Sequence, residues 1–148
     1  MTVNIFLGMS RVTKRDFTAS GVYVLEAYKN NIPVTIENKK LITYEVIGFE
    51  HTNSNVIALT LLDAALKRVQ NADKVQIFTD NISVLSMPNI HRQIEQGKNR
   101  VGLMYESLWM PIRNRIVNYD WSVFGLRHEQ KVLMQDILQK QGGQKYVG

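Results

Sequence analysis

The hydrophobic positions in the first third of the chain predict three strands. Residues 3–7 alternate hydrophobic and polar positions, residues 21–28 contain the apolar run Val22 to Leu25, and residues 41–49 place hydrophobic side chains on two faces. Asparagine and proline between the second and third runs predict a turn at Asn30, Asn31 and Pro33. A brief extended piece follows, with a second turn over residues 37–40. This part of the chain therefore predicts an antiparallel meander.

Beyond residue 50 the hydrophobic positions take up helical spacing. Asn55 is predicted to cap a helix over residues 56–70. A strand at 74–79 follows, and then two short helical pieces within 81–96, broken at Pro88. The last predicted elements are a helix over 101–117, a strand at 119–124 and a helix over 126–141. In this last helix the side chains predicted to face inward are Val132, Leu133, Ile137 and Leu138. This order predicts one mixed α/β domain over residues 1–141, followed by a flexible C-terminal tail at 142–148.

Composition narrows the class of protein. A chain of 148 residues has the size of one domain, and the absence of cysteine excludes disulfides and thiolate metal sites. No apolar run is long enough to span a membrane, so we expect no membrane partner and a cytoplasmic location. The net charge of +5 suits a polyanionic partner but is a weak indication by itself.

Several short segments, in this order, resemble the ribonuclease H family. Residues 3–6 are similar to its first strand, residues 52–55 to the start of its first helix, and Phe78-Thr79-Asp80 to the end of its fourth strand. Residues 121–125, followed by a helix that carries Asp136, give a weaker match. The resemblance covers most of the chain and implies a mixed five-stranded sheet, an antiparallel meander followed by parallel strands, flanked by helices.

The resemblance also implies where catalytic groups would stand. Enzymes of this family use four carboxylates around two Mg²⁺ ions, which need several oxygen ligands to offset their mutual repulsion. The matching positions here are Gly8, Ile57 or its neighbour Ala58, Asp80 and Asp136. Two of the four are carboxylates at best, so we expect a degenerate site with no metal and no cofactor.

Other acids could restore the site, and the two remaining acids have ordinary explanations. Asp63 lies on the correct helix but about 9 Å of helical rise beyond Ile57, whereas Asp16 and Glu50 stand near strand ends. Asp80 could simply cap the helix that follows it. Asp136 could lie on a solvated helix face. Catalytic roles for Asp80 and Asp136 are therefore remnant assignments.

Basic and amide side chains gather in segments that would lie near the substrate groove of this fold. The predicted nucleic-acid-binding residues are Arg11, Lys14, Arg15, Asn53, Asn55, Arg92, Lys98 and Arg100. Contacts from such groups to phosphates would give salt-dependent binding without base specificity. A solvated basic surface is the alternative explanation.

Three functions remain open. The first is a non-catalytic ribonuclease-H-like module that binds RNA, DNA, an RNA–DNA hybrid or a protein that handles nucleic acid. The second is an active Mg²⁺-dependent nuclease with a rearranged carboxylate site. The third is a protein-interaction module, such as an inhibitor or scaffold of a mobile element. The sequence does not predict the oligomeric state.

Overall fold

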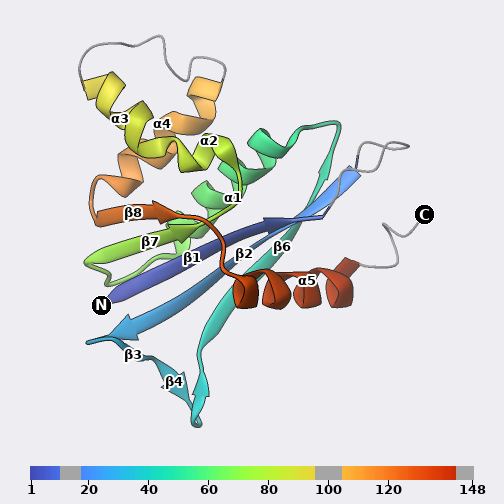
Figure 1. The fold of residues 1–148 in the computed structure, drawn as a ribbon, viewed down its shortest axis with the longest axis vertical. Coiled ribbons are helices and arrows are strands. Elements are labelled where there is room, and N and C mark those ends of the chain that lie inside the picture. The colour runs from blue at the N-terminus through green and yellow to red at the C-terminus, as the bar shows by residue number, and fades with distance from the viewer. Residues whose placement is uncertain (11–17, 96–104, 143–148) are drawn as a thin grey trace.

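One twisted sheet forms the centre of the computed structural model, which describes residues 1–10, 18–95 and 105–142 (Figure 1). Its five main strands are β1 (Thr2–Met9), β2 (Thr18–Lys29), β6 (Ile42–Glu50), β7 (Lys74–Phe78) and β8 (Asp120–Phe124). They lie side by side in the order β6, β2, β1, β7, β8, and the two-residue strand β3 (Ile32–Pro33) pairs antiparallel with the end of β2.

The sheet has an antiparallel half and a parallel half. β2 pairs antiparallel with both β1 and β6, whereas β7 pairs parallel with β1 and with β8. The predicted meander followed by parallel strands is confirmed.

Helices cover both faces of this sheet. They are α1 (Ser54–Arg68), α2 (Ile82–Leu85), α3 (Met87–Glu95), α4 (Glu106–Ile116) and α5 (His128–Gly142). α1 packs on β1 and β2 with α4 against it, whereas α5 packs on the same two strands from the other face (Figure 1). In the part of the chain that the structure describes, no helix is long and apolar enough to cross a membrane.

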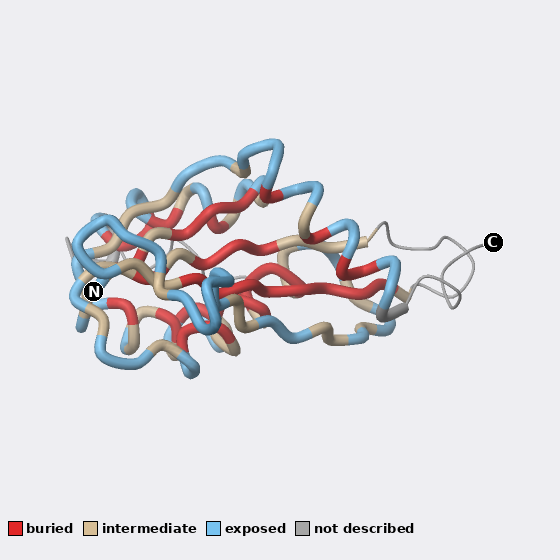
Figure 2. The backbone as a smooth tube through the Cα atoms, turned by 90° about the horizontal axis from the view of Figure 1, so that it is seen from below, coloured by how far each residue is buried: buried red, intermediate tan, exposed pale blue. Residues whose placement is uncertain are grey.

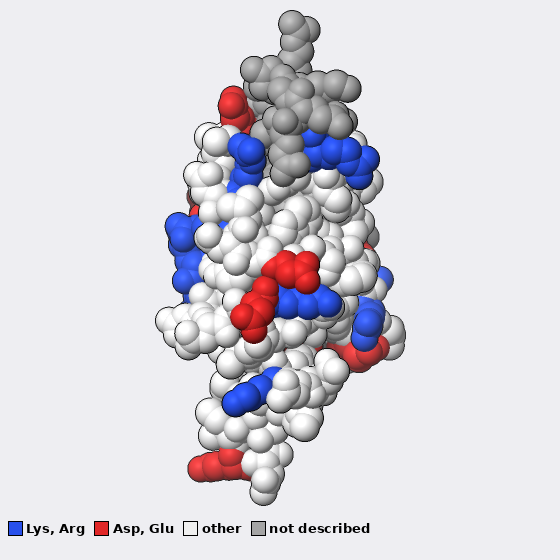
Figure 3. Space-filling model, turned by 90° about the vertical axis from the view of Figure 1, so that its left-hand side faces the viewer, with Lys and Arg blue, Asp and Glu red and all other residues white. Residues whose placement is uncertain are grey.

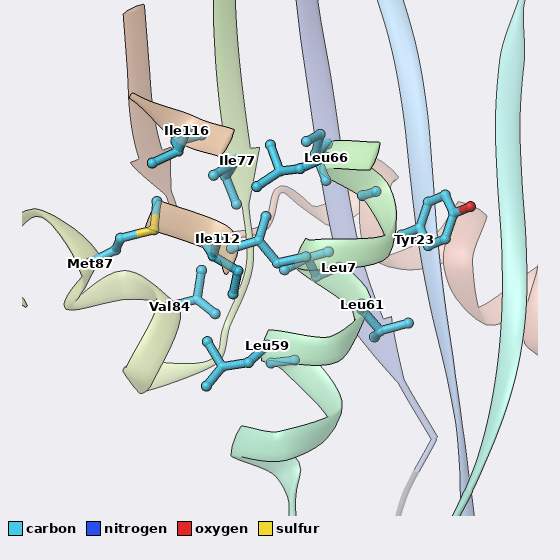
Figure 4. Packing of buried hydrophobic residues seen from close by; sticks show 14 of the residues in the cluster. Leu7, Tyr23, Leu59, Leu61, Leu66, Ile77, Val84, Met87, Ile112 and Ile116 are labelled. Atoms are coloured by element: carbon cyan, nitrogen blue, oxygen red, sulfur yellow. The ribbon is translucent and has the colours of Figure 1, made fainter. Parts of the chain in front are cut away.

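Alternation along the central strands divides the core between the two faces. Ile5 and Leu7 of β1 belong to the larger cluster beneath α1, and Phe6 between them belongs to the smaller cluster beneath α5. Figure 4 shows Leu7, Leu61 and Ile112 within the larger cluster. The strands at the centre of the sheet are therefore buried on both sides (Figure 2).

The cap of α1 differs from the predicted one. Asn53, not Asn55, is the N-cap, and its side chain accepts hydrogen bonds from the backbone N–H groups of Asn55 and Val56. The helix therefore begins two residues earlier than predicted, at Ser54. Both asparagines have the right chemistry for a cap, so residue preference alone did not separate them.

The predicted break between two short helices is present, but Pro88 does not cause it in the way expected. α2 ends at Leu85, Ser86 separates the helices, and Pro88 is the second residue of α3. A proline in the first turn of a helix loses no intrahelical hydrogen bond, so Pro88 lies in the start of α3 rather than at its break.

The inward face of α5 also differs. Val132 was predicted to face inward but is 55 % exposed, whereas Met134 is buried together with Ile137 and Leu138. Gln130 is buried as well. Its Oε1 accepts a hydrogen bond from the backbone N–H of Arg127 at the start of the helix, so this polar atom is not left without a partner. The buried face is therefore rotated relative to the predicted one.

The turns of the meander need left-handed backbone, which asparagine tolerates better than most residues. Asn30 and Asn31 have φ of 52° and 65°, and Glu37 and Asn38 have φ of 53° and 65°. These turns shape an arm that also contains the small hairpin of β4 (Thr35–Ile36) and β5 (Lys39–Lys40). The arm extends away from the main sheet at the bottom of Figure 1.

Candidate functional site

Strand pairing places the predicted site at one edge of the sheet. β1 and β7 are parallel neighbours, and Phe6 is paired with Phe78. Gly8 and Asp80 each follow two residues beyond that pair, so both lie where the two strands end. A cleft of about 520 Å³ opens there. Its described lining residues are Leu7, Gly8, Met9, Ser54, Asn55, Thr79, Asp80, Asn81, Ile82, Leu126, Lys131, Met134 and Gln135.

Asp80 is the one carboxylate among the described residues that line this cleft. Its Oδ2 lies 3.2 Å from Nζ of Lys131 on α5, and its Oδ1 accepts a long hydrogen bond of 3.4 Å from the backbone N–H of Leu126. Both charged side chains are about half exposed. Asp80 therefore faces an ammonium group of the chain itself. Asn81, not Asp80, caps α2.

Gly8 occupies the position where the resemblance implies a first carboxylate. A Cβ added there would lie 2.8 Å from Sδ of Met134 and 3.3 Å from its Cβ. Met134 is 2 % exposed, so it fills the space that a side chain at position 8 would need. A carboxylate at this position would require α5 or Met134 to move.

Ile57 occupies the second position and belongs to the core. It lies on the sheet-facing side of α1 and is fully buried, and its Cγ2 would be 3.1 Å from a Cβ placed on Gly21 of β2. The absence of a side chain at Gly21 thus lets α1 approach the sheet closely at Ile57. A carboxylate at position 57 would be enclosed in apolar surroundings.

The acids farther along the helices lie outside the cleft lining. Asp136 is exposed and pairs with Lys140 on the next turn of α5 at 3.0 Å. Asp63 pairs with Lys67 at 3.2 Å and with Arg115 of α4 at 3.3 Å. Glu50 ends β6, is exposed and does not line the cleft. Asp16 lies outside the described residues.

This donor set does not fit two Mg²⁺ ions. Each Mg²⁺ takes six oxygen ligands in octahedral geometry, supplied in proteins by one or two carboxylates and several waters. Residues 1–10, 18–95 and 105–142 contain no group of three or more His, Cys, Asp or Glu side chains that could hold a metal. Asp80 alone, already paired with Lys131, offers too little negative charge.

The comparisons with known proteins concern the backbone rather than the cleft. The sequence matches no protein-family model and no curated protein. Among solved structures it is similar to LC9-RNase H1, a type 1 RNase H with the type 2 active-site motif, at 16% identity and a TM-score of 0.65 over 97% of this chain and 73% of that chain. The chain has the ribonuclease H-like fold.

Two further structures agree. The RNase H1 of Halobacterium salinarum is 16% identical with a TM-score of 0.61, over 95% of this chain and 99% of that one. A foamy viral protease–reverse transcriptase in complex with dsDNA is 15% identical with a TM-score of 0.66, over 96% of this chain and 94% of that one. The predicted ribonuclease H-like resemblance and the predicted sheet are confirmed. At this level of identity, the similarity shows the fold and not the activity.

The predicted nucleic-acid-binding residues fall into different places. Asn55 lines the cleft, Asn53 is used as the cap of α1, and Arg92 lies exposed on α3. The other candidates lie outside the described residues: Arg11, Lys14, Arg15, Lys98 and Arg100. On the face drawn in Figure 3, the described lysines and arginines are scattered among neutral and acidic groups. Their roles remain predictions.

Residues of α5 that line the cleft were missed. Lys131, Met134 and Gln135 lie on one side of the helix, three and four positions apart. The recurrence of Gln130, Met134 and Ile137 at helical spacing was a signal for this orientation. The polar Gln130 concealed it, since a glutamine is seldom expected on a buried face.

A buried tyrosine lies on the face of the sheet that α1 covers. Tyr23 of β2 is fully buried; its hydroxyl donates to Oε1 of Glu45 at 2.7 Å and accepts from Nη1 of Arg68 at 3.3 Å. Burial, followed by the hydrogen bond to Glu45, raises the pKa of the Tyr23 hydroxyl, and Arg68 opposes this effect. The group therefore stabilises the fold in its neutral form.

Proposed function

We propose that this chain is a non-catalytic ribonuclease H-like module that binds nucleic acid. The observation that carries this proposal is the contact between Asp80 and Lys131, in the cleft where the catalytic ions of active relatives would be expected. An ammonium group beside the one carboxylate supplies positive charge there without a metal ion.

Gly8 and Ile57 support the non-catalytic part. Met134 packs against Gly8, and Ile57 is enclosed by the core, so neither position has room for a carboxylate without rearrangement. Activation of water between two metal ions needs ligands that these positions do not supply.

The net charge and the similar structures support nucleic acid as the partner. A charge of +5 favours a polyanion. Two of the similar structures are named as RNase H1, and the third is a foamy viral protease–reverse transcriptase in complex with dsDNA. A partner that is itself a nucleic-acid-handling protein is an outcome that the following experiment would reveal.

The experiment combines binding and cleavage on the same labelled single-stranded RNA, DNA duplex and RNA–DNA hybrid. We expect binding without cleavage in Mg²⁺ or Mn²⁺, and affinity should fall by roughly 0.9 log unit per log unit of salt for each B-DNA phosphate neutralised. Metal-dependent cleavage that Asp80→Asn abolishes would instead establish a nuclease.

Charge reversal tests where the phosphates lie. Lys14→Glu with Arg15→Glu should weaken binding to all sequences alike, because phosphates carry no sequence information. The matched control is Lys29→Glu with Lys39→Glu, since both lysines are exposed and Lys29 lies at the end of β2 remote from the cleft. A protein captured independently of the Lys14 and Arg15 reversals, with no nucleic-acid binding at low salt, would favour the interaction module.

A further inference from the structure

The cleft has the lining of a site for a flat organic ring. We propose that it receives one unstacked nucleobase, with Lys131 placed to meet the adjoining phosphate. The proposal rests on the proposed function and deepens it, because it assigns a recognised group to the cleft. A volume of about 520 Å³ lies within the usual range for small-molecule sites, roughly 300–1,000 Å³.

Apolar and sulfur-containing side chains form much of the lining. Met9 comes from β1, Met134 from α5, and Ile82, at the start of α2, is 78 % exposed. Methionine sulfur makes favourable contacts with aromatic rings, and apolar side chains bind a ring better than they bind a phosphate. These side chains therefore favour a base over the backbone of a nucleic acid.

Asn55 supplies a fixed polar group beside this apolar lining. Its Oδ1 accepts hydrogen bonds from Nδ2 of Asn81 at 3.1 Å and from Oγ of Ser83 at 2.9 Å. Asn81 is itself held, because its Oδ1 accepts from the backbone N–H of Val84 at 3.1 Å. Because Oδ1 of Asn55 already accepts two hydrogen bonds, its Nδ2 is the group left to donate to a ligand. The edges of nucleobases carry acceptors for such a donor.

Lys131 supplies the charge. Its ion pair with Asp80 joins two side chains that are 49 % and 58 % exposed, and an exposed pair of this kind is weak. The ammonium group can therefore turn toward a phosphate without a large loss of stability. Asp80 would repel the same phosphate, so the phosphate is expected on the solvent side of Lys131.

Three oligonucleotides separate base recognition from backbone binding: a blunt duplex, the same duplex with a single-stranded overhang, and that overhang with abasic residues. In fluorescence anisotropy at fixed salt, we expect the base-containing overhang to bind about tenfold more tightly than the abasic one. Ile82→Ala should reduce this difference, whereas Val132→Ala, at an exposed aliphatic residue of α5 outside the cleft, should not.

The phosphate contact has its own matched pair of variants. Lys131→Gln should weaken binding of the overhang, and Lys140→Gln should leave it unchanged, because each lysine pairs with an aspartate on the surface but only Lys131 lines the cleft. If both substitutions change the affinity for the overhang equally, Lys131 does not contact the phosphate.

A nucleoside monophosphate tests whether the ligand is a free nucleotide. In methyl NMR spectra, the signals of Met9 and Met134 should shift on titration, and that of Met87, which is buried at the start of α3 and does not line the cleft, should not. Shifts without any oligonucleotide binding would keep the nucleobase site and reject the proposed function. Binding of all three oligonucleotides with equal affinity would overturn the nucleobase site while leaving nucleic-acid binding intact.

Discussion

The close packing of Met134 against Gly8 predicts that Gly8→Ala destabilises the wild-type protein but does not destabilise a Met134→Ala variant. Gly8→Ala adds one carbon, which would lie 2.8 Å from Sδ of Met134. Gly8 lies in the extended strand β1, so alanine fits the backbone there and the disturbance is one of packing.

Two opposing contributions set the magnitude. Overpacking a filled core costs about 1–3 kcal/mol, and replacing glycine by alanine stabilises by about 0.4–1 kcal/mol through the unfolded chain. Gly8→Ala should therefore lower the free energy of unfolding by up to about 2.6 kcal/mol. In a Met134→Ala background the Sδ and Cε atoms at 2.8 and 3.1 Å are gone and only the Cβ of residue 134, at 3.3 Å, stays close, so the same substitution should stabilise by up to about 1 kcal/mol.

Urea unfolding of the four proteins in this cycle measures both effects, with the slope of each transition checked for constancy. Gly125→Ala is the matched control, since nothing lies within 4 Å of a Cβ at that position. If Gly8→Ala has the same effect with and without Met134, the argument that Met134 fills the space beside Gly8 is wrong.

Three further substitutions test other parts of the structure. Ile57→Glu should cost more than about 4 kcal/mol or prevent folding, because it encloses an unpaired carboxylate; near-normal urea stability would contradict the burial of Ile57. Asn53→Ala should cost about 0.5–2 kcal/mol in urea unfolding and Asn53→Asp little, and equal losses would reject the capping role. The raised pKa of Tyr23 stabilises the fold below its ordinary pKa of about 10, and this contribution is lost as pH rises through the folded-state pKa. Stability should thus fall more steeply above about pH 10 in the wild type than in Tyr23→Phe, and parallel urea midpoints across that range would contradict this.

Periodicity predicted most of the fold because each element buries a regular face. The strands β1, β2 and β6 are runs rich in apolar residues, and the turns between β2 and β6 carry Asn30, Asn31 and Asn38 where left-handed backbone is needed. The orientation of α5 was harder to predict, because polar side chains occupy most of its positions. Packing against the sheet selects the face with Met134 over the face with Val132.

The site was predicted in part. The resemblance indicated that Gly8 and Asp80 should lie together, and strand pairing places both at the same edge of the sheet. The contacts of Met134 with Gly8 and of Lys131 with Asp80 join residues far apart in sequence. Such contacts depend on the rotation of α5, for which the helical spacing of Gln130, Met134 and Ile137 was the one local signal, weakened by the polar Gln130.

The position of β1 at the centre of the sheet has a consequence for how the protein assembles during synthesis. β1 pairs on one side with β2, the next strand in the chain, and on the other side with β7, which follows the whole meander and α1. As the chain leaves the ribosome, β1, β2 and β6 can pair before β7 exists, because early segments fold first and closure over a long separation is slow.

During that interval, the edge of β1 that later receives β7 carries open backbone donors and acceptors, which can pair with other chains. Pulse-labelled hydrogen exchange during refolding should show amides of β2 and β6 protected before those of β7. Simultaneous protection of all three strands would argue against this order. The centre of the finished sheet is therefore, for part of the synthesis, an open edge that other chains can pair with.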